Sequence, residues 1–80
     1  MSAGLSVGIT TRNRPRWLAT CIESLALLSG ILAEILVFDD ASDPPVVAAS
    51  NVAPLTVLRD PSRPGLIVGR NRMVRRAITP

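Results

Sequence analysis

Apolar residues along the first part of the chain alternate with polar or small ones, and this alternation is typical of strands. Leu5, Val7 and Ile9 predict a first strand at about residues 5–10. The run at 34–38 is apolar nearly throughout, as expected of a strand that is buried on both faces. A similar run predicts a third strand at 54–58.

Between and after these strands, the apolar spacing becomes helical. Pro15 suits a first helical turn capped by Asn13 or Arg14, and Gly30 is a natural stop, so a helix is predicted over about 15–29. The apolar stripe of this helix consists of Trp17, Leu18, Cys21, Ile22, Leu25 and Leu28.

Two further helices are predicted in the second half of the chain. A weak short helix is expected at 46–49, and a longer one at about 66–78. In the longer helix, Ile67, Val74 and Ile78 recur at helical spacing, after a loop rich in proline and glycine.

This order of strand, helix, strand, helix, strand, helix predicts an α/β fold with right-handed crossovers and a parallel sheet. Residues 1–80 are long enough for one small domain. In the usual doubly wound order the first strand lies inside the sheet, so here we expect it as an unpaired edge. That edge favours either a truncated, partial domain or self-association through the exposed sheet edge.

Charge is segregated along the chain, although the net charge is only +3. Residues 1–16 and 59–80 carry all nine basic residues, every one of them Arg, and residues 17–58 carry five of the six acids. Two interpretations stay open with about equal weight: a compositional bias, or Arg side chains that meet phosphate in space. Only two aromatic residues are present for base stacking, so we expect no nucleic-acid partner.

The cellular setting follows from cysteine usage and hydropathy. A single cysteine, Cys21, excludes an internal disulfide framework and fits a reducing compartment. No apolar run approaches the ~20 residues of a membrane span, and no signal peptide is apparent. We therefore expect a cytoplasmic chain with no membrane span.

Candidate chemistry begins with Asp39 and Asp40, which directly follow the second predicted strand. In open α/β folds, ligands bind at the carboxyl edge of the sheet. These carboxylates could hold a divalent cation, accept hydrogen bonds from a ribose or base, or cap a turn with help from Asp43. Successive strand residues point to opposite faces, so the two need not share a role.

Two loops fall at the same predicted edge. Thr10 to Pro15 precedes a helix whose first N–H groups favour anions, but it has neither a Gly-x-Gly-x-x-Gly fingerprint nor a Walker motif. The alternative to an anion-binding loop is a capped helix start whose arginines are solvated. Near the other end, Arg70 lies beside Asn71 and could reach back across the carboxyl edge to a phosphate.

Three segments together resemble the amino-terminal half of a family-2 glycosyltransferase with the GT-A fold, a three-layer Rossmann-like arrangement. They are SVGITTRNRPRWLATCIESL, EILVFDDASDPP and RDPSRPGLIVGRNRMVRRA, in the family's order and at its spacing. The resemblance implies a nucleotide-diphospho-sugar donor, an acceptor that the sequence does not identify, and an inverting transfer of the sugar.

Carried over by position, the resemblance places Thr10 and Arg12 beside the nucleotide base, and Asp40 on the uracil or ribose with Asp39 as its neighbour. Arg70 falls where the family's arginine approaches the nucleotide. Three departures are visible: Arg12 stands where a stacking Tyr is common, Ala41 replaces the turn glycine, and Gly69 replaces an alanine.

The family's metal-binding Asp-x-Asp and its catalytic base have no counterpart in these eighty residues. The resemblance implies a divalent cation, Mg²⁺ or Mn²⁺, in the intact enzyme, with ligands outside this chain. We therefore expect the donor-binding half of a site, without any catalytic residue, that does not transfer sugar alone. The alternative is a noncatalytic α/β module that assembles through its open edge.

Overall fold

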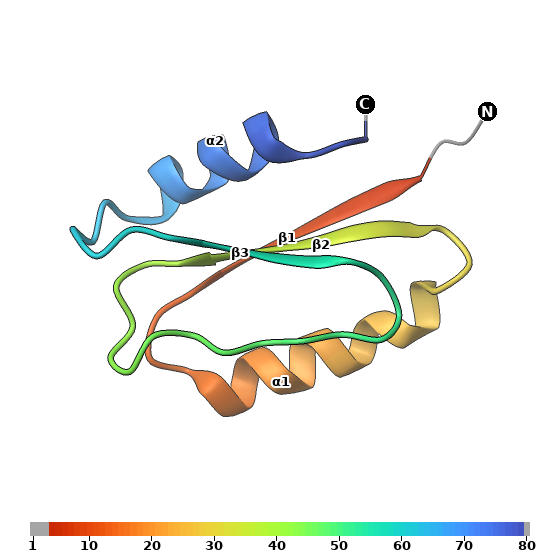
Figure 1. The fold of residues 1–80 in the computed structure, drawn as a ribbon, viewed down its shortest axis with the longest axis horizontal. Helices are drawn as coiled ribbons and strands as arrows, with labels where there is room; N and C mark the ends of the chain where they lie inside the picture. The colour runs from red at the N-terminus through yellow and green to blue at the C-terminus, as the bar shows by residue number, and fades with distance from the viewer. Residues whose placement is uncertain (1–3, 80) are drawn as a thin grey trace.

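A computed structural model describes residues 4–79, so residues 1–3 and 80 of the predicted 1–80 domain lie outside it. Three parallel strands form one sheet in the order β1-β2-β3. Helix α1 covers one face of this sheet and helix α2 covers the other, which makes three layers (Figure 1). The elements are β1 (Leu5–Thr11), α1 (Pro15–Ser24), the 3-10 helix η1 (Leu25–Leu28), β2 (Leu32–Asp39), β3 (Leu55–Arg59) and α2 (Leu66–Arg76). The α/β class and the parallel sheet predicted from the sequence are confirmed.

Strand β2 is the centre of the sheet, since it pairs with β1 on one side and β3 on the other. Its side chains Ile35, Val37 and Phe38 have no exposed surface. The prediction of a strand buried on both faces is therefore confirmed. Within residues 4–79, β1 and β3 each pair with one strand only, so β1 forms an edge of the sheet, as expected.

The larger apolar core lies between the sheet and α1. Its buried members are Ile9, Leu18, Ile22, Leu32, Ile35 and Val37. Helix α1 begins at Pro15 after the cap residue Arg14 and continues as η1 to Leu28, close to the predicted span. Trp17 was expected in the apolar stripe, yet it is 48% exposed and lies outside this core.

The connection from β2 to β3 has no helix, so the predicted short helix at 46–49 is wrong. This segment runs as extended chain along the α1 side of the sheet (Figure 1). Val46, Ala48, Val52 and Ala53 pack against the α1 core from there. The N–H of Val46 donates to the Asp39 carboxylate at 3.0 Å, and so short a helix would gain too few hydrogen bonds to repay its nucleation.

The smaller core lies under α2 and consists of the buried residues Leu36, Phe38 and Met73. Gly69 lets α2 approach the sheet, because a Cβ there would lie 2.5 Å from the Phe38 ring. Gly8 of β1 likewise leaves room for Met73 of α2, because a Cβ at Gly8 would lie 3.1 Å from the Met73 sulfur.

Helix α2 is present as predicted, but the face it turns to the sheet differs from the predicted stripe. Ile67, Val74 and Ile78 are 75%, 76% and 74% exposed, while Gly69 and Met73 are buried. The helix uses its smallest residue at the closest contact, and hydrophobic periodicity does not detect a glycine. Neither helix within residues 4–79 has the length and apolar character needed to cross a bilayer.

Candidate nucleotide site at the carboxyl edge of the sheet

The carboxyl ends of all three strands meet at one edge of the sheet. The register pairs Thr11 of β1 with Asp39 of β2, and Asp39 with Arg59 of β3. The loops that follow these strands therefore begin side by side, at the edge where α/β folds bind ligands. The residues at and beyond the strand ends decide what this edge can bind.

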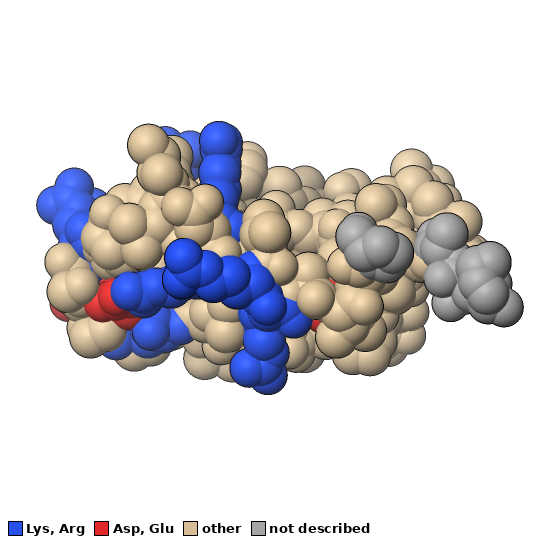
Figure 2. Space-filling view, turned by 90° about the horizontal axis from the view of Figure 1, so that it is seen from above, with Lys and Arg blue, Asp and Glu red and all other residues tan. Residues whose placement is uncertain are grey.

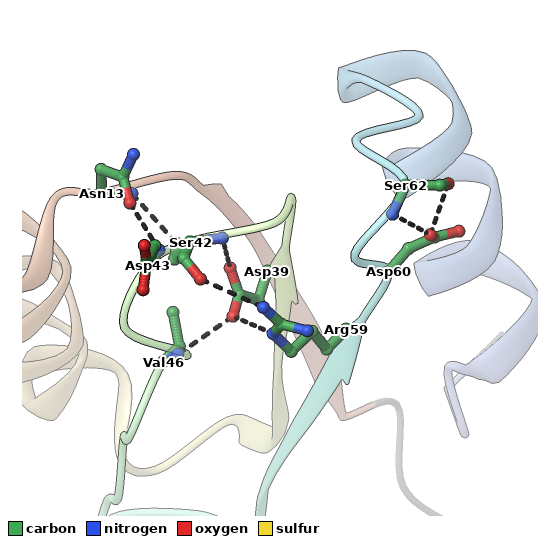
Figure 3. Close-up of polar contacts among 8 residues, drawn as sticks. All are labelled: Asn13, Asp39, Ser42, Asp43, Val46, Arg59, Asp60 and Ser62. Carbon is green, nitrogen blue, oxygen red and sulfur yellow. Dashed lines mark hydrogen bonds and ion pairs between the residues drawn. The ribbon is translucent and has the colours of Figure 1, made fainter.

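Asp39 holds the loop after β2 in place (Figure 3). Its side chain is fully buried and accepts hydrogen bonds from the N–H of Ser42 at 2.8 Å and of Val46 at 3.0 Å. Nε of Arg59 lies 3.3 Å from Asp39 Oδ2, and the same guanidinium donates to the Ser42 carbonyl at 3.1 Å. Both oxygens of Asp39 are thus occupied by protein donors.

The ionisation of Asp39 reflects two opposing influences. Burial on its own raises the pKa of the carboxyl, but hydrogen bonds from Ser42 and Val46, together with the charge of Arg59, lower the pKa below its ordinary value. Asp39 is therefore a stable carboxylate whose charge holds its own loop together.

The loops after β1 and β2 are joined to each other by a reciprocal pair of hydrogen bonds (Figure 3). The N–H of Asn13 donates to Ser42 Oγ at 2.9 Å, and the N–H of Asp43 donates to Asn13 Oδ1 at 2.8 Å. Asn13 has a φ of 54°, a left-handed conformation that Asn tolerates. The edge is thereby fixed by interactions within the chain.

Ala41 also adopts a left-handed conformation, with a φ of 61°. This is the position at which the family resemblance expects a glycine. A Cβ in this region of φ/ψ space is unfavourable, so the backbone here has kept the glycine conformation without the glycine.

Asp40 differs from Asp39 in both direction and partners. Its Oδ1 accepts one hydrogen bond, from the N–H of Gly65 at 3.1 Å, at the start of α2. Its Oδ2 has no protein donor among residues 4–79, and the residue as a whole is 7% exposed. Asp40 therefore has one carboxylate oxygen that no group of the described chain satisfies.

Strand alternation places Thr10 on the same side of the sheet as Asp40. Ile9 and Val37 face the α1 core, whereas Gly8 and Phe38 contact α2. Thr10 and Asp40 therefore belong to the α2 side, and Asp39 belongs to the α1 side. The notion that the two aspartates need not share a role agrees with this geometry.

Arg70 lies on α2, where it lines a cavity of about 260 Å³ with Ser6, Gly8 and Leu36. This cavity is on the same side of the sheet as Thr10 and Asp40, although neither residue lines it. No hydrogen bond or ion pair within residues 4–79 joins Arg70 to Asp40. The three residues therefore share one side of the sheet, and no side-chain hydrogen bond or ion pair within residues 4–79 joins them.

Arg12 is exposed in the loop after β1 and makes no ion pair within the described range 4–79. Its neighbour Thr11 is buried, and Thr11 Oγ1 lacks a hydrogen-bond partner there. The hydrogen bonds that Asn13 makes with Ser42 and Asp43 hold this loop, so the Arg12 side chain extends from a constrained segment of backbone.

Sequence reasoning missed the structural roles of Arg59 and Ser42. Arg59 ends β3 as Asp39 ends β2, and this equivalence of strand-end positions could have suggested the ion pair. Ser42 follows Asp39 by three residues, a spacing at which an Asp side chain commonly bonds a loop N–H.

The described residues do not form a metal centre of their own. Within residues 4–79 no three His, Cys, Asp or Glu side chains come close enough together to hold an ion. Both oxygens of Asp39 are already taken, which leaves Asp40 alone at this edge. The donor set present therefore does not fit a divalent cation.

The open parallel sheet with a helix on each face defines an α/β class of fold, in which ligands bind at the carboxyl edge of the strands. The chain matches the family model described as "Glycosyl transferase family 2" over residues 6–80. The protein therefore belongs to glycosyltransferase family 2. Neither the comparison with curated proteins nor that with solved structures gives a significant match.

Proposed function

We propose that this chain supplies the donor side of a glycosyltransferase site, where it binds the nucleoside diphosphate of an activated sugar. The observation that carries the proposal is the position of Asp40. It directly follows the central strand, lies on the same side of the sheet as Thr10 and Arg70, and keeps one oxygen without a protein donor among residues 4–79. A carboxylate in such a position accepts hydrogen bonds from a ribose hydroxyl or a base N–H.

The neighbouring groups suit the other parts of a nucleotide. Thr10 can donate or accept through its hydroxyl, and Arg12 projects from a fixed loop toward solvent. Arg70 on α2 is a guanidinium without an ion pair among residues 4–79, and this group matches phosphate oxygens in bidentate geometry. Asp39 has a positioning role, because it fixes the loop from which Asp40 and Ser42 extend.

In the reaction of the proposed enzyme, an acceptor hydroxyl attacks the anomeric carbon and inverts it while the nucleoside diphosphate departs. A general base must reach the acceptor hydroxyl. The carboxylates of this chain are already engaged or belong to the donor side, so we assign no catalytic residue to it. A divalent cation supplies charge to the leaving diphosphate in this family, and its ligands would come from outside these residues.

Calorimetric titration of the chain with uridine diphosphate or thymidine diphosphate tests the proposal. Asp40→Asn is expected to weaken binding by about tenfold, the equivalent of one charge-assisted hydrogen bond. Asp43→Asn is the matched control, since it makes the same charge change at an exposed residue of the same loop. Equal affinities for wild type and both variants, or no affinity for either nucleotide, would overturn the proposal.

The second candidate function is a noncatalytic module that assembles through strand edges. It is favoured by the free edges of β1 and β3 within the described part of the chain. Unpaired strand edges are templates for pairing with another chain. Light scattering after size exclusion distinguishes it: a monomer at high micromolar concentration excludes assembly, and a dimer that Val57→Pro or Ser6→Pro disrupts supports it, because the N–H groups of both residues face the free edges.

A further inference from the structure

A second candidate site lies between β3 and α2, and it shares Arg59 with the carboxyl edge but none of Thr10, Asp40 and Arg70. It is a groove of about 530 Å³ between β3 and the last turns of α2. We call it the arginine groove. Its walls carry Arg59, Arg72, Arg75 and Arg76, and Phe38 and Leu58 lie at its floor.

The arginine groove carries positive charge that the chain does not neutralise. Arg59 is paired with Asp39, and Arg72 is paired with Asp60. Arg75 and Arg76 are exposed and have no ion-pair partner within residues 4–79. No acid in the described part of the chain lines the groove. Figure 2 shows Arg side chains gathered over the α2 side of the molecule, with little acidic surface beside them.

Contacts with the sheet and with Asp60 constrain the position of the Arg72 guanidinium. Arg72 lies over the Phe38 ring, with its Cζ 5.9 Å from the ring centroid, and also contacts Asp60. Gly69 and Met73 hold the same helix against the sheet. The arginines of α2 therefore extend from a helix whose distance from the sheet is set by this packing.

Backbone donors of β3 add to the guanidinium groups. The N–H of Asp60 donates to the Asp39 carbonyl at 3.2 Å, so strand alternation turns the N–H groups of Val57 and Arg59 away from β2. Both residues line the groove. Outward N–H groups beside Arg side chains are the donors that phosphate oxygens accept.

We propose that the arginine groove binds a phosphate-bearing anion with more than one phosphoryl charge, at a site separate from the Asp40 edge. The recognised chemistry is a diphosphate-like group held by Arg75 and Arg76. Its source is either a soluble diphosphate or two adjacent phosphodiester headgroups of anionic lipids, since both bring two phosphate groups with negatively charged oxygens. The site does not depend on the proposed nucleotide site, because none of Thr10, Asp40 and Arg70 lines the groove.

The test is a titration of the full chain with inorganic pyrophosphate at low salt, followed by calorimetry and by ¹H–¹⁵N correlation spectra. In the spectra, the expected shifts concentrate on the amides of Val57, Arg59, Arg75 and Arg76. The double variant Arg75→Gln/Arg76→Gln is expected to weaken binding by at least about tenfold. Arg14→Gln/Arg16→Gln, which removes the same charge from exposed positions at the start of α1, should change it less than about threefold.

A second arm uses vesicles of phosphatidylcholine with and without phosphatidylglycerol. Binding to the anionic vesicles alone, lost in the Arg75/Arg76 variant and kept in the Arg14/Arg16 variant, assigns the phosphate to a lipid headgroup. Pyrophosphate binding with no vesicle binding assigns it to a soluble ligand. Equal weakening in the two double variants, or no binding of either probe, would overturn the site, whatever the outcome of the Asp40 titrations.

Discussion

On the α1 face of the sheet, six buried apolar side chains pack together and the β2–β3 connection closes over them, whereas three buried side chains suffice on the α2 face. The α1 face ends at its carboxyl edge in Asp39, whose oxygens are satisfied within the chain. The α2 face ends in Asp40, one oxygen of which has no protein donor within residues 4–79, and it carries Arg70, Arg75 and Arg76, which form no ion pair in that range. One face is closed over apolar side chains, and we propose that the other presents its polar groups to ligands.

Removal of Asp39 should produce the largest effect and damages the stabilising face. Asp39→Ala leaves two loop N–H groups and the Arg59 guanidinium without their acceptor, which should cost about 3 kcal/mol of unfolding free energy. Urea denaturation followed by circular dichroism measures this. Asp43→Ala, at an exposed position, should cost less than about 0.5 kcal/mol. A loss below about 1 kcal/mol for Asp39→Ala would show that the loop does not depend on this carboxylate.

Enlargement of Gly69 probes the closest contact of the other face. In Gly69→Ala the new Cβ would meet the Phe38 ring at 2.5 Å, so α2 must move away from the sheet. Overpacking of this kind costs about 1–3 kcal/mol. The same denaturation measurement applies, with Arg70→Ala as a helix control that should change little. An unchanged midpoint for Gly69→Ala would mean that α2 is not held against Phe38.

Restoration of a glycine at position 41 should stabilise the edge between the two faces. Ala41→Gly removes the Cβ from a left-handed backbone, and we expect a gain of about 1 kcal/mol. A gain in urea midpoint confirms the strained conformation. The control is Ala49→Gly, in the extended connection, which should give no gain; equal changes in both variants would contradict the explanation.

The smallest expected effect is on the pH dependence of stability, which compares Asp39 on the α1 side of the sheet with Asp60, which is bonded to α2. Asp60 accepts hydrogen bonds from Ser62 and from Arg72, which lower its pKa from 3.8 to about 2. Because the folded pKa is lower than the unfolded pKa, the stabilisation is complete above 3.8 and is lost as the pH falls toward about 2. The lowered pKa of Asp39 acts in the same direction.

Urea midpoints measured between pH 5 and pH 2, a range set by these pKa values, should therefore fall as the pH decreases. Asp60→Asn should flatten that decline without abolishing it, since Asp39 still titrates. A decline that is identical with and without Asp60 would show that its contacts do not persist in solution.

The strands and α1 were predictable because their apolar spacing is set by burial, and the parallel sheet followed from the alternation of strands and helices. Two errors have physical causes. The 46–49 segment stays extended because the N–H of Val46 is bonded to the carboxylate of Asp39, a contact that hydrophobic periodicity does not reveal. The contact face of α2 is built on Gly69, and the outward Ile67 and Val74 gave the misleading periodicity.

For the carboxyl edge, alternation predicted that Asp39 and Asp40 could differ, but it did not identify the structural one. That depends on the loop N–H groups of Ser42 and Val46, and on Arg59, which the register of β2 with β3 places beside Asp39. The roles of Thr10, Arg12, Asp40 and Arg70 in nucleotide binding stay predictions that rest on the family resemblance and on their side of the sheet.

The most direct test of this division of roles is a ¹H–¹⁵N correlation spectrum of the chain titrated with uridine diphosphate. We expect the largest shifts at the amides of Thr10, Arg12, Asp40 and Gly65, with little change along α1. Shifts confined to α1 and the β2–β3 connection, or none at saturating nucleotide, would contradict the assignment of the α2 side as the face that binds ligands.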